Sequence, residues 1–223
     1  MKTSILLKLF IAKNSPELQI GALLEEHILE TNQDSYPQKL IDGHNHQQLI
    51  SSVFVNHPAY LKSEALLDSK LSKSSDKIIP MFYDHFLRLN WEACTEVAFE
   101  DFYKNLDQTI LKYQHHLPYK QNKLIKNIHQ HNWYHELKTI GGTHSIMKGQ
   151  TKRTTFYTNL EQSIENLMEH YAEHRDNFFE ILPDLQHASR EFLVMKRELV
   201  LGLDTKERAI LSSPQRNVSF QRC

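Results

Sequence analysis

The adjacent pair Asp84 and His85 is the strongest candidate for chemistry in the sequence. Around it, apolar residues recur at helical spacing between positions 78 and 91: Ile78, Phe82, Phe86 and Leu89. An ionised carboxylate in such a helix is costly unless it is paired, hydrogen-bonded or bound to a metal, so Asp84 requires a partner. Neighbouring side chains project about 100° apart, which lets both reach one cation at a helix crossing. A buried Asp84 that caps a neighbouring helix while His85 packs would give the same pattern, and spacing alone leaves both interpretations open.

Other residues of reactive type give weaker signals. The chain has 14 histidines, and His131 and His135 stand at i, i+4 with His129 and His144 nearby. Such a pair binds zinc when a third ligand converges, but no H-E-x-x-H pattern is present, so exposed polar histidines are the favoured interpretation. Cys94 lacks the neighbouring charges that mark a nucleophile and is expected to pack in the core.

Long periodic segments must position these side chains. Ser15 and Pro16 are a good helix start, because Ser accepts a backbone hydrogen bond as N-cap and Pro at the first helical position gives up no needed donor. Residues 56–58 should end one helix, residues 72–76 should form a solvated loop, and Gly141-Gly142 and Pro183 should each break the chain. We predict helices over residues 4–12, 16–30, 38–55, 60–71, 78–91, 97–117, 120–137, 159–182 and 185–203.

Composition points to a compact all-α protein. The 223 residues are 40% apolar and 24% charged, with only six Gly and seven Pro. This is enough apolar material for one core, and no repeat or strand alternation suggests a further division. We therefore expect a single-domain helical bundle over residues 1–203, followed by a polar, flexible tail over residues 204–223.

Charge and cysteine content exclude several classes of protein. A formal net charge of -1 argues against a dedicated nucleic-acid binder, which needs clustered Lys and Arg. The apolar run from Ser4 to Ala12 is too short to span a bilayer and lacks a signal-peptide cleavage site, so it is expected to be a buried helix. The two cysteines, Cys94 and Cys223, lie far apart, which fits a reducing cytoplasm.

A series of short segments resembles the acyl carrier protein phosphodiesterase family in order and spacing, over about residues 4 to 187. The segments are Gly21–Glu26, Asp42–Leu49, Asn56–Pro58, Phe82–Leu87, Asn90-Trp91, Asn132-Trp133, Gly149–Thr154 and Glu169–Tyr171. The family resembles distant HD-domain phosphohydrolases, with an all-α fold. The resemblance implies removal of 4′-phosphopantetheine from holo-acyl carrier protein with a divalent metal, usually Mn²⁺, in connection with fatty acid biosynthesis.

The resemblance also implies site residues. His46, Asp84 and His85 match histidine and aspartate positions of the family's metal site, and Glu26 occupies the position of a further aspartate. We therefore expect His46, Asp84, His85 and Glu26 as metal ligands. Asp84 and His85 are also expected as catalytic residues.

The sequence departs from the family at other expected ligands. Lys8 and Phe10 stand where the family has histidines, and Ile50 stands where it has an aspartate. Glu26 keeps a carboxylate on a longer stem, which suits the same hard cation. The Lys8 ammonium could replace the charge of the metal, which would preserve the fold and end catalysis. The alternative is thus a degenerate member that binds a carrier protein or phosphorylated ligand without hydrolysis; a phosphohydrolase for a small nucleotide-like substrate is a third hypothesis.

Basic residues could form the docking surface for the acidic carrier protein that the resemblance implies. Lys148, Lys152 and Arg153 lie in or beside a family-like segment and are the expected substrate-binding residues. A second set on one helix face is Lys120, Lys123 and Lys126. An ordinary solvated surface would explain either set as well.

Overall fold

The described residues form helices and no strand. The computed structural model describes residues 5–24, 27–28, 35–151 and 162–201. The predicted all-α class is confirmed for this part of the chain. Residue contacts divide the chain into one unit over Met1–Ser189 and another over Arg190–Cys223, each described by itself. The predicted domain limits at 203 and 204 stay a prediction, and the predicted tail lies outside the described residues.

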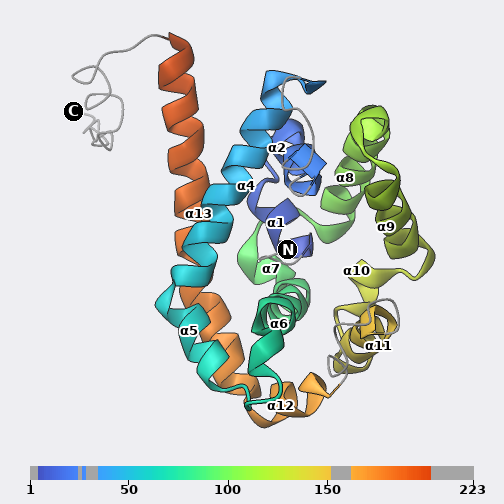
Figure 1. The fold of residues 1–223 in the computed structure, drawn as a ribbon, viewed down its shortest axis with the longest axis vertical. Coiled ribbons are helices and arrows are strands. Elements are labelled where there is room, and N and C mark those ends of the chain that lie inside the picture. Colours follow the sequence, from blue (N-terminus) through green and yellow to red (C-terminus); the bar gives the residue numbers. More distant parts are fainter. Residues whose placement is uncertain (1–4, 25–26, 29–34, 152–161, 202–223) are drawn as a thin grey trace, which may run out of the picture. The chain divides into compact units, whose positions relative to one another are not determined.

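Twelve described α-helices, labelled in Figure 1, follow the chain. Their bounds are α1 Ile5–Ile11, α2 Pro16–Leu23, α4 Gln38–Asn56, α5 Pro58–Ala65, α6 Ser75–Leu89, α7 Trp91–Cys94, α8 Phe99–Tyr113, α9 Tyr119–Gln130, α10 Trp133–Glu136, α11 Ile140–Thr151, α12 Ser163–Glu169 and α13 Tyr171–Leu201. Short 3₁₀ turns cover Ser72–Ser74 and Gln114–His116. None of the described helices is long and apolar enough to cross a membrane.

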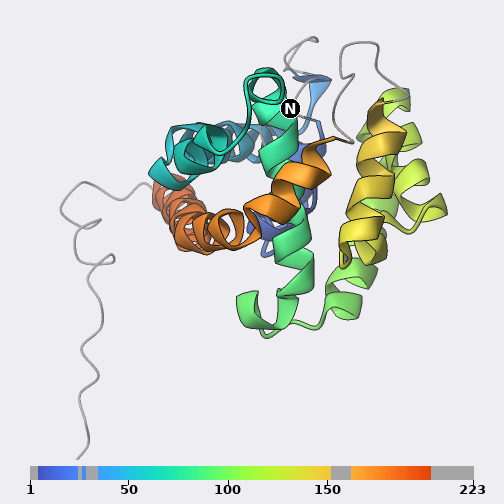
Figure 2. The ribbon, with the colours of Figure 1, turned by 90° about the horizontal axis from the view of Figure 1, so that it is seen from below.

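Helix α6 runs through the middle of the first unit, between α4 and α5 on one side and α8 to α11 on the other (Figure 2). Its large apolar side chains are fully buried: Ile78, Ile79, Phe82, Tyr83, Phe86 and Leu87. All seven residues of α1 are buried as well, which confirms the predicted buried helix near the N-terminus. The core of this unit therefore surrounds α1 and α6, and a polar group on either helix needs a partner inside the protein.

Several helix boundaries follow the predicted signals. The Ser15 hydroxyl accepts a hydrogen bond from the Leu18 amide (3.3 Å), and Pro16 is the first residue of α2. Helix α4 ends at Asn56, and α5 begins at Pro58 with the His57 side chain accepting from the Ala59 amide. Both predicted boundaries are confirmed. They could be predicted because each depends on a local hydrogen bond or on the geometry of proline.

Other boundaries were predicted wrongly. Gly141 and Gly142 do not break the chain but lie in the first turn of α11, and Pro183 lies inside α13. The predicted loop at residues 72–76 is a 3₁₀ turn followed by the start of α6. The predicted helix over residues 120–137 is divided, because Asn132 adopts a left-handed backbone with φ of 52° between α9 and α10. Leu49, an apolar residue of α4, is 38% exposed.

Two glycines allow α2 and α4 to cross in backbone contact. A Cβ atom on Gly21 would lie 2.5 Å from the Cα of Gly43, and one on Gly43 would lie 2.5 Å from the carbonyl oxygen of Glu17. Real Cβ atoms do not approach backbone this closely, so both positions require glycine for space. Both glycines fall in segments that resemble the phosphodiesterase family, and the crossing is the structural reason for them.

Candidate functional site

Asp84 caps the first turn of α1. Its side chain is 1% exposed, and its two oxygens accept hydrogen bonds from the backbone amides of Leu6 (3.1 Å) and Leu7 (2.7 Å). The first amides of a helix have no partner within it, and the helix dipole favours a negative charge there. The contacts of the helix-capping interpretation are therefore present in the structure.

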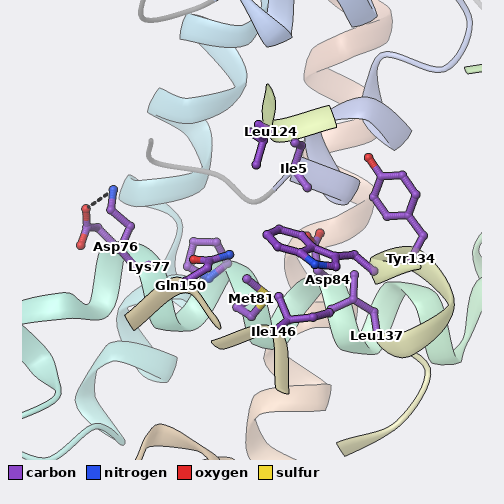
Figure 3. A pocket seen from close by; sticks show the side chains of 12 residues that line it. Ile5, Asp76, Lys77, Met81, Asp84, Leu124, Tyr134, Leu137, Ile146 and Gln150 are labelled. Carbon is purple, nitrogen blue, oxygen red and sulfur yellow. Dashed lines mark ion pairs between the residues drawn. The ribbon is translucent and has the colours of Figure 1, made fainter. Parts of the chain in front are cut away.

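A small pocket of about 70 Å³ opens beside Asp84 (Figure 3). Asp84, Trp133 and Gln150 line it, and these residues come from three separate segments that resemble the family. Lys77 lies on another side of the pocket, where its ammonium pairs with Asp76 at 2.9 Å. The remaining lining is apolar or aromatic: Ile5, Pro80, Met81, Leu124, Tyr134, Leu137 and Ile146. The pocket therefore combines a small, mostly apolar space with a few charged and polar groups.

His85 points from α6 to the end of α10 and the start of α13. Its Nδ1 lies 2.7 Å from the carbonyl oxygen of Leu137, which accepts only, so Nδ1 carries the proton. In the neutral ring, the lone pair of Nε2 then accepts a hydrogen bond from the Tyr171 hydroxyl at 3.2 Å. Burial lowers the pKa of His85, although the hydrogen bond to Leu137 acts in the opposite direction. His85 is thus a neutral imidazole with a proton-accepting nitrogen next to Tyr171.

His46 lies at the other end of α1. Its Nε2 is 2.8 Å from the hydroxyl oxygen of Ser189, and that hydroxyl donates to the carbonyl oxygen of Ile11 at 3.1 Å. Since the single hydroxyl proton is used on Ile11, the His46 Nε2 is the donor to Ser189. Burial lowers the pKa of His46 to about 4. Ser189 was not singled out by the sequence, because a serine in the middle of a long helix carries no local signal.

A pH dependence of stability follows from His46. The unfolded ring takes up a proton near pH 6.5 and the folded ring only near pH 4, so stability present above pH 6.5 is lost as the pH falls toward 4. The loss is expected to be on the order of 3 kcal/mol. Urea unfolding at several pH values should give a weaker pH dependence for His46→Gln than for the wild type. The control His187→Gln changes an exposed ring on α13 and should keep the wild-type dependence; equal dependence in all three proteins would contradict the prediction.

The positions where the sequence departs from the family are part of the core. Phe10 is fully buried with its ring edge against Trp91 (centroids 5.1 Å apart), and Ile50 is 1% exposed. The ammonium of Lys8, 3% exposed, donates to the carbonyl oxygen of Ala22 at 2.9 Å. Phe10 and Ile50 therefore supply apolar packing. Lys8 supplies a buried amino group at a position where the family has a histidine.

As placed, the described candidate ligands do not fit one metal ion. Asp84 binds the amides at the start of α1, whereas His46 is linked through Ser189 to the carbonyl at its end. Seven helical residues span about 10 Å, and amides and carbonyls point away from each other along the axis. Ligands of one hard cation each lie only about 2.0 to 2.6 Å from it. No group of three or more His, Cys, Asp or Glu side chains among the described residues is arranged to hold a metal.

The remaining candidates are spread over the surface or fall outside the described residues. Glu26, Lys152 and Arg153 belong to the latter group. Lys148 is exposed on α11, two residues from the pocket-lining Gln150. A further set of exposed lysines lies on α9: Lys120, Lys123 and Lys126.

Some of the other reactive side chains have structural partners. The His129 Nε2 pairs with Asp107 at 3.2 Å, and its Nδ1 bonds the Tyr103 hydroxyl at 2.7 Å. Cys94 is a half-buried free thiol whose pKa is raised to about 11 by burial, opposite to what a nucleophile needs. His131 is exposed, as expected, and His135 is half-buried with its ring edge against Phe99.

Comparison with known proteins places these features in context. The family model described as acyl carrier protein phosphodiesterase matches residues 5–185. A curated protein of Photorhabdus laumondii subsp. laumondii, named acyl carrier protein phosphodiesterase, is 19% identical over 181 residues, which cover 81% of this chain and 91% of that protein. No solved structure matches the chain significantly.

Proposed function

Because the chain belongs to the acyl carrier protein phosphodiesterase family, we propose that it is a phosphoric diester hydrolase that acts on acyl carrier protein. The proposed reaction is removal of 4′-phosphopantetheine from the holo form, in the cytoplasm and linked to fatty acid biosynthesis. The observation that carries the proposal is the family match, which extends over most of the first unit.

The pocket at Asp84 supports the proposal by its lining. A pantetheine arm is a narrow chain with apolar and amide portions, and the pocket offers apolar walls with Asp76, Lys77, Asp84 and Gln150 as polar groups. In this proposal the Lys77 ammonium, held by Asp76, attracts the phosphodiester to one side of the pocket. Three family-like segments meet at this place, which is expected of a shared substrate site.

His85 does not line this pocket, and it is proposed as the group that accepts a proton from the attacking water through the Tyr171 side or after Tyr171 moves. Its Nε2 is the lone-pair nitrogen of a neutral ring, and the Tyr171 hydroxyl bonded to it is half-buried. Tyr171 must either relay the proton or turn aside, so it is proposed as a positioning residue. Asp84 contributes by fixing α1 against α6, since both of its oxygens already bind α1 amides.

Docking of the carrier protein is proposed at the lysines beside this pocket. Lys123 and Lys126 flank the pocket-lining Leu124 on α9, and Lys148 lies between the pocket-lining Ile146 and Gln150 on α11. Exposed cations so placed would attract an acidic partner and make its association sensitive to salt. Lys152 and Arg153 continue this proposed substrate-binding set in sequence.

Divalent cation dependence, with Mn²⁺ as the expected metal, stays a prediction from the resemblance. The contacts of Asp84 and the position of His46 favour a second candidate function, which is binding of the carrier protein without hydrolysis. The buried Lys8 side chain favours the same candidate, because it occupies the place of a metal-binding histidine of the family and donates to the Ala22 carbonyl instead.

Intact mass spectrometry of holo-acyl carrier protein tests both functions. Incubation with the wild-type protein should convert holo to apo carrier, with Mn²⁺, Mg²⁺ and EDTA as separate arms. His85→Gln should slow conversion by about 100-fold or more, because a positioned general base contributes about 10² to 10⁴. The control His187→Gln, on the exposed face of α13, should convert the carrier at the wild-type rate.

Unchanged carrier mass in every arm would exclude hydrolysis of this substrate. Calorimetric titration with holo carrier then tests the second function. Binding would support it, and the absence of binding would exclude this carrier as a partner. Lys148→Glu should weaken binding and Lys39→Glu, at an exposed site on α4, should not. Equal affinity of the wild type and both lysine variants for the carrier would contradict the proposed docking surface.

A further inference from the structure

A second cavity, of about 460 Å³, lies between the turn after α1 and helix α8. It shares no lining residue with the pocket at Asp84. The two also meet opposite ends of α1, because Asp84 binds its first turn and Lys13 follows its last residue. A volume of several hundred Å³ is typical of sites for small organic molecules, which occupy about 300 to 1,000 Å³.

The charges that line this cavity have one sign. Its lining contains two lysines, Lys13 and Lys112, and no aspartate or glutamate. The other polar groups are neutral and include Asn105, Gln108 and Thr109 on one face of α8. Amide and hydroxyl groups of this kind carry no charge, so they can hydrogen-bond a ligand without repelling a bound anion.

Lys13 is an unusually placed cation within this lining. Its side chain is half-buried, and its ammonium lies 3.8 Å from the centre of the Phe10 ring. Among the described residues its interaction partners are this ring and the Cys94 thiol, and none is a carboxylate. Burial lowers the pKa of Lys13 because no full negative charge offsets the desolvation. An anion in the cavity would supply that charge.

Lys112 is the second cation and is more exposed. Burial raises the pKa of the nearby Glu17 carboxyl, but the hydrogen bond from Tyr113 and smaller effects that include Lys112 lower it overall. The Lys112 ammonium also lies 5.1 Å from the centre of the Tyr113 ring. Glu17 does not line the cavity. Two ammonium groups at one cavity match the charge of a phosphate monoester, which is close to dianionic at neutral pH.

We propose that this cavity binds a phosphorylated small molecule. Lys13 and Lys112 would hold the phosphate. The side chains of Asn105, Gln108 and Thr109 would bind the hydroxyl or amide groups of the organic part, and the Phe102 ring in the lining would contact its carbon atoms. The proposal does not depend on the proposed hydrolase function, because the two cavities have separate linings.

Binding of ribose 5-phosphate, pyrophosphate, citrate and ribose to the full chain tests the proposal. The two phosphate compounds should raise the unfolding temperature in a saturable way, and ribose should not. Amide signals over residues 105–112 should shift in NMR spectra, whereas those over residues 140–150 beside the Asp84 pocket should not. Binding of citrate alone, or shifts confined to residues 140–150, would overturn the assignment.

Matched variants locate the phosphate. Lys112→Gln, at an exposed position that should not affect folding, is expected to weaken phosphate binding by about tenfold, and Lys13→Gln by at least as much, as expected for the loss of one charge-assisted contact. Lys13→Arg keeps the charge and should retain part of the affinity if the Lys13→Gln variant is well folded. Lys73→Gln, an exposed lysine of the 3₁₀ turn before α6, should bind as the wild type. Wild-type affinity in both glutamine variants would refute the site.

Discussion

Replacement of Asp84 by alanine is expected to lower the free energy of unfolding by about 3 to 5 kcal/mol, because it leaves two buried helix amides without an acceptor. The amides of Leu6 and Leu7 are bonded to the two carboxylate oxygens, and α1 is buried along its whole length. Water therefore has poor access to replace the lost bonds. Urea unfolding followed by circular dichroism measures the change.

Asp84→Asn and Asp101→Ala are the matched variants. Asparagine keeps the size of the side chain but offers only one acceptor and turns a donor toward the second amide. The decrease in the free energy of unfolding for Asp84→Asn should therefore be smaller than for Asp84→Ala. Asp101 is exposed in the first turn of α8, and its removal should cost less than about 1 kcal/mol. If the measurement in EDTA showed no loss for Asp84→Ala, the capping role would be refuted and a metal-binding role would be favoured.

This structural role changes how activity data on Asp84 must be interpreted. Loss of turnover in Asp84→Ala would follow equally from a lost catalytic group and from a loosened α1. His85→Gln is the sharper test, because glutamine can still donate to the Leu137 carbonyl while it removes the proton-accepting nitrogen. A stable but inactive His85→Gln protein would assign the chemistry to His85 rather than to the fold.

Gly43→Ala is expected to destabilise the protein by about 3 kcal/mol or to prevent folding. The new methyl group would meet the backbone of α2 at Glu17 and Gly21, and backbone cannot move aside as a flexible side chain does. Gly21→Ala should have a similar effect, since its methyl group would meet α4 at Gly43. Thermal and urea unfolding of the two variants measure the change.

Gly141→Ala is the control for this pair. Gly141 also lies in a helix, but a Cβ atom there meets nothing within 4 Å. Alanine should therefore raise the free energy of unfolding by about 0.5 to 1 kcal/mol through its better helix propensity. If Gly43→Ala and Gly141→Ala behaved alike, the close crossing of α2 and α4 would not be a source of stability.

Much of the fold could be predicted from local sequence signals. The spacing of apolar residues identified the buried α6, and the cap at Ser15 and the proline at 58 set helix ends. Glycine and proline misled the prediction of helix boundaries at positions where tertiary packing determines the local structure. Gly142 stands where a Cβ atom would clash with the backbone of Glu136, so it serves close packing rather than a chain break. Pro183 is tolerated within α13 because Ile181, Leu182 and Leu185 are buried on the core side of the helix.

The candidate site was predictable only in part. The rule that a buried carboxylate needs a partner identified Asp84, whereas Trp133 and Gln150, which lie in family-like segments, were not predicted as site residues and line the same pocket. The nature of the partner could not be predicted, since backbone amides of α1 leave no signature in a sequence. His46 matches a family position, but its position in space depends on Ser189, which is 143 residues away in sequence.

The contacts at the two ends of α1 have a consequence for how the chain is made. Asp84 and Ser189, which bind the start and the end of this helix, follow it by 77 or more residues and by 178 residues. During synthesis at about 5 to 20 residues per second, the ribosome releases α1 long before it has translated Ser189. Translation of the intervening 178 residues takes about 9 to 36 seconds at this rate, and during that time α1 lacks its final partners. Nascent chains of increasing length should become resistant to proteolysis within α1 only after Ser189 has left the ribosome.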